Sequence, residues 1–442
     1  MSMRFSDLDG KRIGVWGLGR EVRSLVGHVR ASLPDASIAV LVRENPGDDA
    51  GELIANGTRV VDAADAVSAL SQCDFVVRSP GVSIYRPELQ AVAAAGVGIG
   101  TATGLWLAER GGRRVIGVTG TKGKSTTATL IAHLAKAAGH NVHLAGNIGA
   151  PALDLLHVPA TDWAVIELSS YQISDLSAGS ELAVVTNIYA DHADWHETDA
   201  HYRRDKLRLL GLPGVRVCVL PAALDASCAG SRVERFDSTD GWHVADHSLR
   251  HPDGTEVPIQ SLPLRGHHNA VNLCAALTAL DAAALQRPPL PAALEGVRPL
   301  PHRLQTVCQA EGIEWVDDSI STTPESTIAA LEAFASQPVV LISGGQDRGQ
   351  DYAALGRVVA RHDVIALGMP TTGPRLLAAA LQAGVPEERV LNVANMAEAV
   401  SAARGLAAPG TVVLLSPAAP SYDSYRNFEE RGDHFAALAR GR

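Results

Sequence analysis

The sequence predicts an α/β protein built on mainly parallel sheets. Short apolar runs rich in β-branched residues recur along the chain, and each is followed by a glycine-bearing turn and a stretch with helical periodicity. Strands and helices that alternate in this way form βαβ units, in which neighbouring strands run parallel. The runs that we expect to form strands are 12–17, 115–118, 164–168, 182–187, 339–342, 364–367 and 412–415.

The length and two breaks in the pattern predict the domain organisation. A chain of 442 residues accommodates about three domains, at about 100–200 residues each. A polar, glycine-bearing break at 108–114 and a proline-rich stretch at 287–301 each precede a new strand pattern. We therefore predict domains at 1–110, 111–300 and 301–442.

Composition and charge exclude several classes of protein. Hydrophobic residues make up 46% and charged residues 19% of the chain, which excludes wholesale disorder. The formal net charge of −10 argues against nucleic-acid binding, because proteins that neutralise phosphate backbones are usually basic. Five dispersed cysteines without a C-x-x-C pair argue against a disulfide framework, and no apolar run is long enough to span a membrane. We expect a cytoplasmic monomer without nucleic-acid or membrane partners.

The first expected strand ends in Gly17, Leu18 and Gly19. This Gly-x-Gly turn is a weak signal for a dinucleotide or UDP site, because Val22 replaces the third glycine of the full fingerprint. The turn is equally typical of a tight strand–helix connection. Both interpretations stay open, and a dehydrogenase with a nicotinamide cofactor is a hypothesis that depends on this turn alone.

The second expected strand leads into a phosphate-binding loop. The sequence Gly-Thr-Lys-Gly-Lys-Ser-Thr at 120–126 lies between the strand at 115–118 and a stretch whose apolar residues have helical spacing. Glycines let backbone N–H groups face phosphate oxygens, and the start of a helix adds positive potential. Lys124 is expected to reach the β- and γ-phosphates, and the hydroxyl of Ser125 to bind Mg²⁺. The sequence therefore predicts a nucleoside triphosphate site.

Polar residues follow the next two expected strands. Glu167 lies at the end of one strand, His192 follows the other, and Lys206 lies in a basic helical stretch. Because the carboxyl ends of parallel strands meet at one edge of a sheet, Glu167 is expected beside the phosphate-binding loop. A carboxylate and an imidazole can bind a metal ion there, whereas a bare ammonium cannot.

These residues also have simpler explanations. His192 taken alone is more often a structural histidine, and Lys206 taken alone lies on a solvated helix face. A third alternative is a separate metal cluster formed by Asp191, Asp194 and His196.

Taken together, the motifs resemble those of the Mur ligases, the ATP-dependent amino-acid ligases that build the stem peptide of peptidoglycan. The resemblance spans the whole chain, and the ordered set is far more specific than any one motif. The set comprises the loop at 120–126, Glu-Leu-Ser-Ser-Tyr-Gln at 167–172, Asn187, Asp191, His192, Lys206, Gly-His-His-Asn-Ala-Val-Asn at 266–272, Pro-His-Arg at 301–303, Asp318, Ser319, Gly344, Gly345, Asp347, Leu-Ser-Pro-Ala at 415–418 and Asn-Phe-Glu-Glu-Arg-Gly at 427–432. The last motif looks most like that of the glutamate-adding members.

The resemblance implies a fold and a set of cofactors. It implies a Rossmann-like N-terminal domain for the UDP-linked substrate, a central P-loop ATPase-like domain, and a Rossmann-like C-terminal domain for glutamate. It also implies ATP and two Mg²⁺ ions, with Lys124, Glu167, His192 and Lys206 as the catalytic group. Ser125 and Glu167 would bind one ion. His192 and Lys206 would bind the other, with Lys206 carbamylated by CO₂ so that it carries a carboxylate-like group.

The resemblance also implies ligand contacts. The implied ATP contacts are Gly120, Thr121, Lys122, Gly123, Lys124, Ser125, Thr126, Asn269, Asn272, Arg303 and Asp318. The implied glutamate contacts are Thr322, Arg348, Ser421 and Phe428. The implied contacts of UDP-N-acetylmuramoyl-L-alanine are Gly17, Leu18, Gly19, Ser79, Pro80, Gly81, Asn147 and Gln172. Two structural alternatives remain. Asn269 and Asn272 could serve only as helix caps, and Ser421 and Phe428 could serve only in packing near the C-terminus.

Several positions depart from the pattern of the usual glutamate-adding members, among them Arg43 and Glu44, which stand where those members carry an acidic residue. Ile320 stands where they carry a lysine, Arg348 replaces a second lysine, and Thr103 replaces a glutamate. Arginine presents a planar fork where lysine presents a point charge, so the cations offered to the amino acid are rearranged. These departures resemble a divergent branch that adds L-glutamate. We therefore favour L-glutamate, with D-glutamate as the alternative.

Two further functions compete with this interpretation. A folylpolyglutamate synthase shares the phosphate-binding loop and the lysine, but the motif at 427–432 argues against it. A non-catalytic nucleotide-binding regulator would not need Glu167, His192 and Lys206 together.

Overall fold

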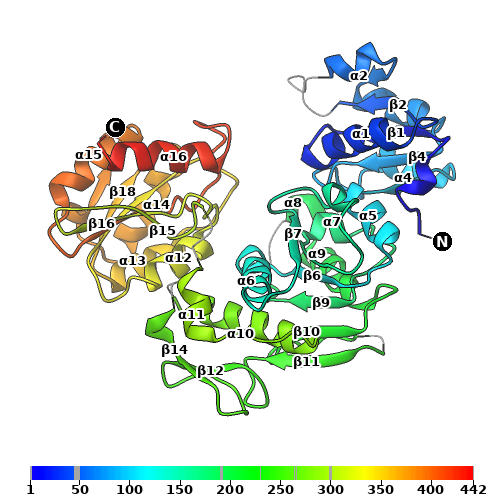
Figure 1. The fold of residues 1–442 in the computed structure, drawn as a ribbon. Coiled ribbons are helices and arrows are strands. Elements are labelled where there is room, and N and C mark those ends of the chain that lie inside the picture. The colour runs from blue at the N-terminus through cyan, green and yellow to red at the C-terminus, as the bar shows by residue number, and fades with distance from the viewer. Residues whose placement is uncertain are drawn as a thin grey trace. The chain divides into compact units, whose positions relative to one another are not determined.

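The fold is α/β, as the sequence predicts, with three mainly parallel sheets and the helices that connect their strands (Figure 1). The computed structural model describes residues 2–43, 50–189, 193–228, 230–262, 264, 266–297 and 301–441. The chain divides into two compact units, one of Met1–Ser261 with Val271–Gly296 and one of Leu262–Ala270 with Val297–Arg442. The three predicted domain ranges stay a prediction.

The first sheet has five parallel strands in the order β3-β2-β1-β4-β5. Its strands are β1 (Arg12–Trp16), β2 (Ser37–Val42), β3 (Arg59–Val61), β4 (Phe75–Arg78) and β5 (Gly98–Gly100), and its helices are α1 (Arg20–Ser32), α2 (Gly51–Ala55), α3 (Ala66–Leu70), α4 (Pro87–Ala94) and α5 (Ala102–Arg110). Helix α5 shows how the sequence sets such boundaries. The Thr101 hydroxyl accepts the Gly104 N–H at its start, and Gly111, with φ of 66°, ends it.

The second sheet is the centre of the larger unit. Six parallel strands lie in the order β11-β10-β9-β6-β8-β7. They are β6 (Val115–Thr119), β7 (Val142–Gly146), β8 (Trp163–Glu167), β9 (Leu182–Val185), β10 (Val217–Pro221) and β11 (Arg232–Phe236), with helices α6 (Lys124–Ala137), α7 (Ser170–Ile173), α8 (Ala193–His196), α9 (Asp199–Leu207), α10 (His267–Ala282) and α11 (Leu290–Glu295). Every residue of β6 and β8 is buried, as expected for strands covered on both faces.

A small antiparallel sheet follows the central one in the chain. It consists of β12 (His243–Ala245), β13 (Ser248–Arg250) and β14 (Glu256–Pro258). The sequence analysis does not predict it, because strands of three residues show no recognisable periodicity. Single 3₁₀ turns lie at Ser6–Leu8, Ala63–Asp65, Ala152–Leu155, Arg208–Gly211, Ile259–Ser261 and Glu387–Arg389.

The third sheet forms the smaller unit, in the order β15-β16-β20-β17-β18-β19. The first pair is antiparallel and the others are parallel. The strands are β15 (Gln305–Ala310), β16 (Ile313–Asp317), β17 (Val339–Ser343), β18 (Val364–Gly368), β19 (Val390–Asn392) and β20 (Val412–Leu415), and the helices are α12 (Pro324–Glu332), α13 (Ala353–Arg361), α14 (Gly373–Gln382), α15 (Met396–Leu406) and α16 (Phe428–Ala439). All seven runs predicted as strands are therefore strands.

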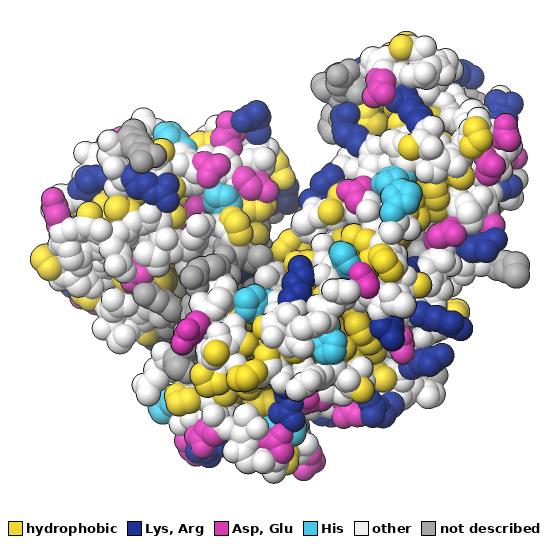
Figure 2. Space-filling model, viewed as in Figure 1, with side chains coloured by type: hydrophobic (Ala, Val, Ile, Leu, Met, Phe, Trp, Pro, Cys, Tyr) yellow, Lys and Arg dark blue, Asp and Glu magenta, His cyan; other side chains and the backbone are white. Residues whose placement is uncertain are grey.

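The surface is mixed in charge. On the face drawn in Figure 2, acidic and basic side chains are interspersed, so no continuous basic surface covers the part of that face that is described. None of the helices in the described ranges combines the length and the apolar composition needed to cross a membrane.

A buried arginine joins the first sheet to the central one within the larger unit. The side chain of Arg78, at the end of β4, is fully buried. Its Nε donates to Asp175 Oδ2 at 2.7 Å, and its terminal nitrogens donate to the Tyr171 carbonyl at 2.7 Å and the Ser174 hydroxyl at 3.0 Å. They also donate to the carbonyls of Pro80 and Val82 at 3.3 and 3.0 Å. The guanidinium thus ties β4 to the segment that contains α7.

Replacing Arg78 should destabilise the larger unit strongly. Arg78→Ala leaves the Asp175 carboxylate without its cation and several buried acceptors without donors, which typically costs about 3–5 kcal/mol. Urea-induced unfolding measures this loss. Arg23→Ala, at an exposed position of α1, is the matched control and should change the free energy of unfolding by less than about 0.5 kcal/mol. Equal losses in the two variants would contradict the prediction.

Candidate active site

The phosphate-binding loop lies between β6 and α6, where the sequence predicts it. Lys124 is the first residue of α6, and Gly123 before it has a φ of 80°, which favours glycine. A side chain at Gly123 would collide with the amide of Asn272 on α10, so the two segments pack without space between them. The Lys122 N–H donates to Asn187 Oδ1 at 2.8 Å, and the Asn187 amide donates back to the Lys122 carbonyl at 3.0 Å. The loop is therefore held on the segment that follows β9.

The predicted magnesium ligands of the first ion lie together. Glu167 ends β8 and is 1% exposed. The Ser125 hydroxyl donates to its Oε2 at 3.0 Å, and the Asn147 amide donates to its Oε1 at 3.3 Å. A hydroxyl beside a carboxylate is the kind of oxygen pair that Mg²⁺ prefers. This pair fits the ion that the sequence analysis assigns to it.

The predicted ligands of the second ion are only partly described. Lys206 on α9 is 2% exposed, and its Nζ lies 5.0 Å from the centre of the Tyr202 ring. The Tyr202 hydroxyl donates to Thr121 Oγ1 at 2.9 Å, which joins α9 to the phosphate-binding loop. His192 lies outside the described residues. Asp191 and the side chain of Asp194 also lie outside them, so the alternative metal cluster stays untested.

A hydrogen-bonded chain that the sequence analysis does not predict links the motif after Glu167 to the residue before Lys206. His196 Nε2 lies 2.9 Å from the Ser170 hydroxyl, and its Nδ1 lies 2.8 Å from Asp205 Oδ2. The carboxylate can only accept, so Nδ1 carries a proton; in the neutral imidazole Nε2 then accepts from the serine. Tyr85 also donates to Asp205, at 2.7 Å, and burial together with this carboxylate raises the pKa of Tyr85 to about 12. Ser170, His196 and Asp205 are all buried.

Six of the eight residues predicted for the UDP-linked substrate form two groups. Gly17, Leu18 and Gly19 follow β1, and Ser79, Pro80 and Gly81 follow β4, the neighbouring strand. The Gly19 N–H donates to the Ser79 hydroxyl at 3.1 Å, and a side chain at Gly17, which has a φ of 74°, would press against Ser79. The structure therefore brings these two segments together at one edge of the first sheet.

Gln172, predicted for the same substrate, is buried inside the larger unit. Its amide nitrogen donates to Glu21 and, at 3.3 Å, to Thr103, and its amide oxygen accepts the Ser169 N–H at 2.7 Å. The oxygen bond completes a capping box at the start of α7. Burial raises the pKa of Glu21, and the hydrogen bonds from Thr103 and Gln172 oppose that shift.

In the smaller unit, Asp318 lies directly after β16 and is 2% exposed. It accepts the Ser416 hydroxyl at 2.8 Å and the Leu304 N–H at 3.2 Å. Burial raises the pKa of Asp318 to about 6, although these partners and the nearby Arg303 guanidinium act in the opposite direction. The structure thus places Arg303 and Asp318 near each other. Asn269 is buried in the part of α10 that belongs to this unit.

The predicted glutamate contacts follow the carboxyl ends of β16, β17 and β20. Thr322 and Arg348 follow the first two strands, and the Arg348 guanidinium carbon lies 5.9 Å from the ring centre of Tyr422, the neighbour of buried Ser421. The Phe428 carbonyl, at the start of α16, accepts the Ser319 hydroxyl at 2.8 Å. These loops therefore meet at one edge of the third sheet.

Arg431, which the sequence analysis quotes within a motif without assigning it a role, holds this edge together. Its Nε donates to the Ser319 hydroxyl at 3.0 Å, and its terminal nitrogens donate to the carbonyls of Ser319 at 2.9 Å and Ala419 at 3.1 Å. Arg431 is 1% exposed, and burial lowers its pKa to about 10.

Comparison with known proteins decides the family. The family model described as Mur ligase middle domain matches residues 118–280, and the one described as Mur ligase, glutamate ligase domain matches residues 302–419. The chain belongs to the Mur ligase family. The resemblance found in the motifs is thereby confirmed, and the two matched ranges cover most of the central sheet and all of the C-terminal sheet.

Individual Mur ligases match the whole chain. This chain is 41% identical to a protein of Xanthomonas axonopodis pv. citri named UDP-N-acetylmuramoyl-L-alanine--L-glutamate ligase. The match covers 99% of this chain and 97% of that protein. A protein of Salinispora tropica with the same name is 39% identical over 99% of each chain. The crystal structure of a MurF ligase from Thermotoga maritima in complex with ADP has a TM-score of 0.63 at 15% identity, covering 100% of this chain and 98% of that one. That similarity supports the fold alone.

The buried carboxyl of Asp318 should make this Mur ligase less stable as pH rises. An unfolded aspartate ionises near pH 4, whereas the folded pKa is about 6, so the folded state binds the extra proton between these values. The free energy of unfolding therefore falls as pH rises from 4 to 6, by up to about 3 kcal/mol for a shift of two pKa units. Asp318→Asn removes this titration. Between pH 4 and pH 7, urea-induced unfolding should show a larger fall in the free energy of unfolding for the unmodified protein than for Asp318→Asn. An equal fall in the two proteins would contradict the assignment.

Proposed function

We propose that the chain is an ATP-dependent ligase that joins L-glutamate to the alanine carboxylate of UDP-N-acetylmuramoyl-L-alanine in peptidoglycan precursor synthesis. Full-length relatives that carry this name support the pair of substrates. The contact between the Ser125 hydroxyl and Glu167, at the phosphate-binding loop, is the geometric observation that supports the chemistry. The enzyme is proposed to act as a monomer in the cytoplasm.

The proposed reaction has two steps. An oxygen of the alanine carboxylate attacks the γ-phosphorus of ATP, the bond from that phosphorus to the bridging oxygen breaks, and ADP leaves. The glutamate amine then attacks the carbonyl carbon of the acyl phosphate, inorganic phosphate leaves, and the nitrogen loses a proton. The first step needs neutralised charge around the phosphoryl group, and the second needs water to be excluded.

Lys124 is proposed to supply part of that neutralisation. Its ammonium donates to the Thr121 carbonyl at 2.9 Å, so the side chain folds back over the phosphate-binding loop. The backbone N–H groups at the start of α6 add positive potential at the same place. A triphosphate bound there would meet both groups.

The residues present fit magnesium at one position and require a modification at the other. Ser125 and Glu167 offer a hydroxyl and a carboxylate oxygen, and Mg²⁺ bound there would offset negative charge on the triphosphate. His192 and Lys206 are proposed for a second ion. An ammonium cannot bind a cation, so we propose that Lys206, whose side chain is buried, is carbamylated.

The choice of L-glutamate rests on the rearranged cations of the C-terminal sheet. Arg348 lies in the loop after β17, against Tyr422, and Ile320 provides no charge beside Ser319. A guanidinium can bind a carboxylate through two parallel hydrogen bonds, which fixes the orientation of the amino acid more firmly than an ammonium does. The Phe428 carbonyl and Ser421, both near Tyr422 in the sequence, complete the proposed pocket.

The identity of the amino acid is tested directly. Phosphate release with UDP-N-acetylmuramoyl-L-alanine and ATP should give a kcat/KM for L-glutamate at least about tenfold above that for D-glutamate, since misplacing one carboxylate costs upwards of about 1.4 kcal/mol. An acceptor in which a folate replaces the muropeptide should give no turnover. Faster turnover of D-glutamate would overturn the choice of enantiomer but not the ligase.

Removing the amine of Lys206 should slow the reaction strongly. Lys206→Ala is expected to lower kcat by roughly 100-fold to 1,000-fold, because an electrostatic group beside the reacting phosphoryl group is lost. Added short carboxylates such as acetate should restore part of the rate if the native side chain is a carbamate. Lys136→Ala, at an exposed position of α6, is the matched control and should keep full activity. Unchanged turnover of Lys206→Ala would contradict its place in the site.

A further inference from the structure

A cavity lies at the amino edge of the central sheet. It has a volume of about 580 Å³ and is lined by residues at or just before the first residues of β6, β8, β9 and β10. These strands are parallel, so their amino ends lie at the edge opposite to the one that carries the phosphate-binding loop and Glu167. The cavity is therefore separate from the candidate active site, and its size is typical of small-molecule pockets.

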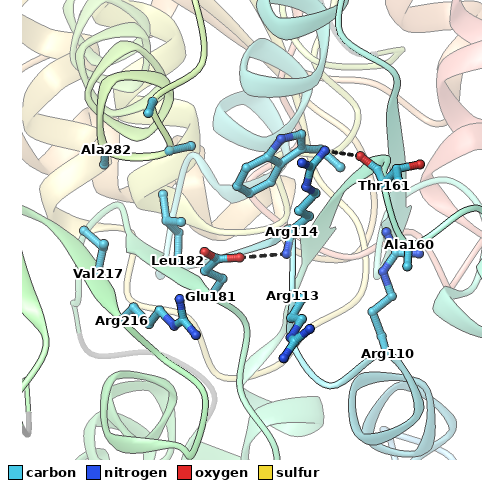
Figure 3. Close-up of a pocket in the computed structure, with 13 residues that line it drawn as sticks. Arg110, Arg113, Arg114, Ala160, Thr161, Glu181, Leu182, Arg216, Val217 and Ala282 are labelled. Atoms are coloured by element: carbon cyan, nitrogen blue, oxygen red, sulfur yellow. Dashed lines mark hydrogen bonds between the residues drawn. The ribbon is translucent and has the colours of Figure 1, made fainter.

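Four arginines and one glutamate line this cavity, so its charge is positive. Arg110 is held in place, because its terminal nitrogens donate to the carbonyls of Val158 at 3.0 Å and Asp162 at 2.6 Å. Arg114 donates through its side chain to the Thr161 carbonyl (Figure 3). These two guanidinium groups belong to the wall.

The other two arginines are available to a ligand. Arg113 and Arg216 are both exposed, and within the described ranges neither side chain makes a hydrogen bond or an ion pair. Figure 3 shows both side chains on the same side of Glu181, with Leu182, Val217 and Ala282 on the other. The cavity thus has a cationic end and an apolar end.

The wall between the two ends is rigidly built. The Glu181 carbonyl accepts the Arg216 N–H at 2.9 Å, and the Glu181 N–H donates to the Gly112 carbonyl at 2.9 Å. The Glu181 carboxylate accepts the Arg114 N–H at 2.8 Å. Arg114 has a φ of 50°, a left-handed conformation that non-glycine residues seldom adopt, and this bond helps to hold it there. One carboxylate oxygen of Glu181, Oε2, is therefore bonded to the backbone, and hydrogen bonds join Glu181 to the segments on both sides of it.

We propose that this cavity binds a small organic phosphate, with its phosphoryl group at Arg113 and Arg216 and its apolar part against Ala282, Ala283 and Ala284. Guanidinium groups match phosphate oxygens in pairs, and the neighbouring apolar side chains add contact area that a bare phosphate cannot use. The proposal stands on the geometry of this edge of the sheet and does not depend on the ligase reaction.

Calorimetric titration of the full chain with 1-naphthyl phosphate as the probe tests the proposal. The control compounds are 1-naphthol, which lacks the phosphoryl group, and inorganic phosphate, which lacks the apolar ring. The probe should bind at least about tenfold more tightly than either half, since both ends of the cavity contribute. The double variant Arg113→Gln/Arg216→Gln should raise its Kd at least about tenfold. Arg357→Gln, at an exposed position of α13, is the matched control and should leave the Kd unchanged.

Two further measurements separate this cavity from the active site. Lys124→Ala, which alters the phosphate-binding loop, should bind the probe as the unmodified protein does, and the double arginine variant should keep its ligase turnover and melting temperature. Three outcomes would each overturn the proposal. They are loss of probe binding in Lys124→Ala, an unchanged Kd of the probe in the double variant, and binding of inorganic phosphate as tight as that of the probe.

Discussion

The candidate site depends on one contact, the hydrogen bond of 3.0 Å from the Ser125 hydroxyl to Glu167. It joins the first turn of α6 to the end of β8, and β6 and β8 are adjacent in the sheet. Because parallel strands end at the same edge, the loop after β6 and the carboxylate of β8 meet without any irregular segment to bring them there. The remaining groups are arranged around this pair, with Asn147 on the other carboxylate oxygen and Asn187 on the loop.

Local sequence patterns predict the frame of the fold and the central part of the site. The seven predicted strands of the three large sheets are mostly buried runs with strong β propensity, and the phosphate-binding loop is a motif that is continuous in the chain. The contacts that the sequence does not predict join distant positions. His196 meets Ser170 and Asp205 at separations of 26 and 9 residues, and Gln172 meets Glu21 across 151 residues. No spacing rule covers such pairs, because the tertiary fold alone decides which side chains become neighbours.

In the smaller unit, too, the sequence predicts the motifs but not the contacts between distant residues. Its motifs mark the loops that follow β16, β17 and β20, but Arg431 acquires its role only when Ser319 and Ala419 are brought to it, at separations of 112 and 12 residues. A guanidinium that is almost fully buried and bonded to backbone carbonyls fixes those loops before any amino acid binds. The departures at Ile320 and Arg348 therefore change which charges these loops offer to the amino acid.

The five hydrogen bonds of Arg78 bear on how this chain can be divided. The sequence predicts a domain boundary after residue 110, yet the partners of Arg78 include Tyr171, Ser174 and Asp175, beyond that limit. A fragment that ends at residue 110 would expose the buried guanidinium of Arg78 to water. The rest of the chain would keep the Asp175 carboxylate without its cation. Recombination between relatives should therefore succeed more often when β4 and the α7 segment are inherited together than when a crossover falls between them.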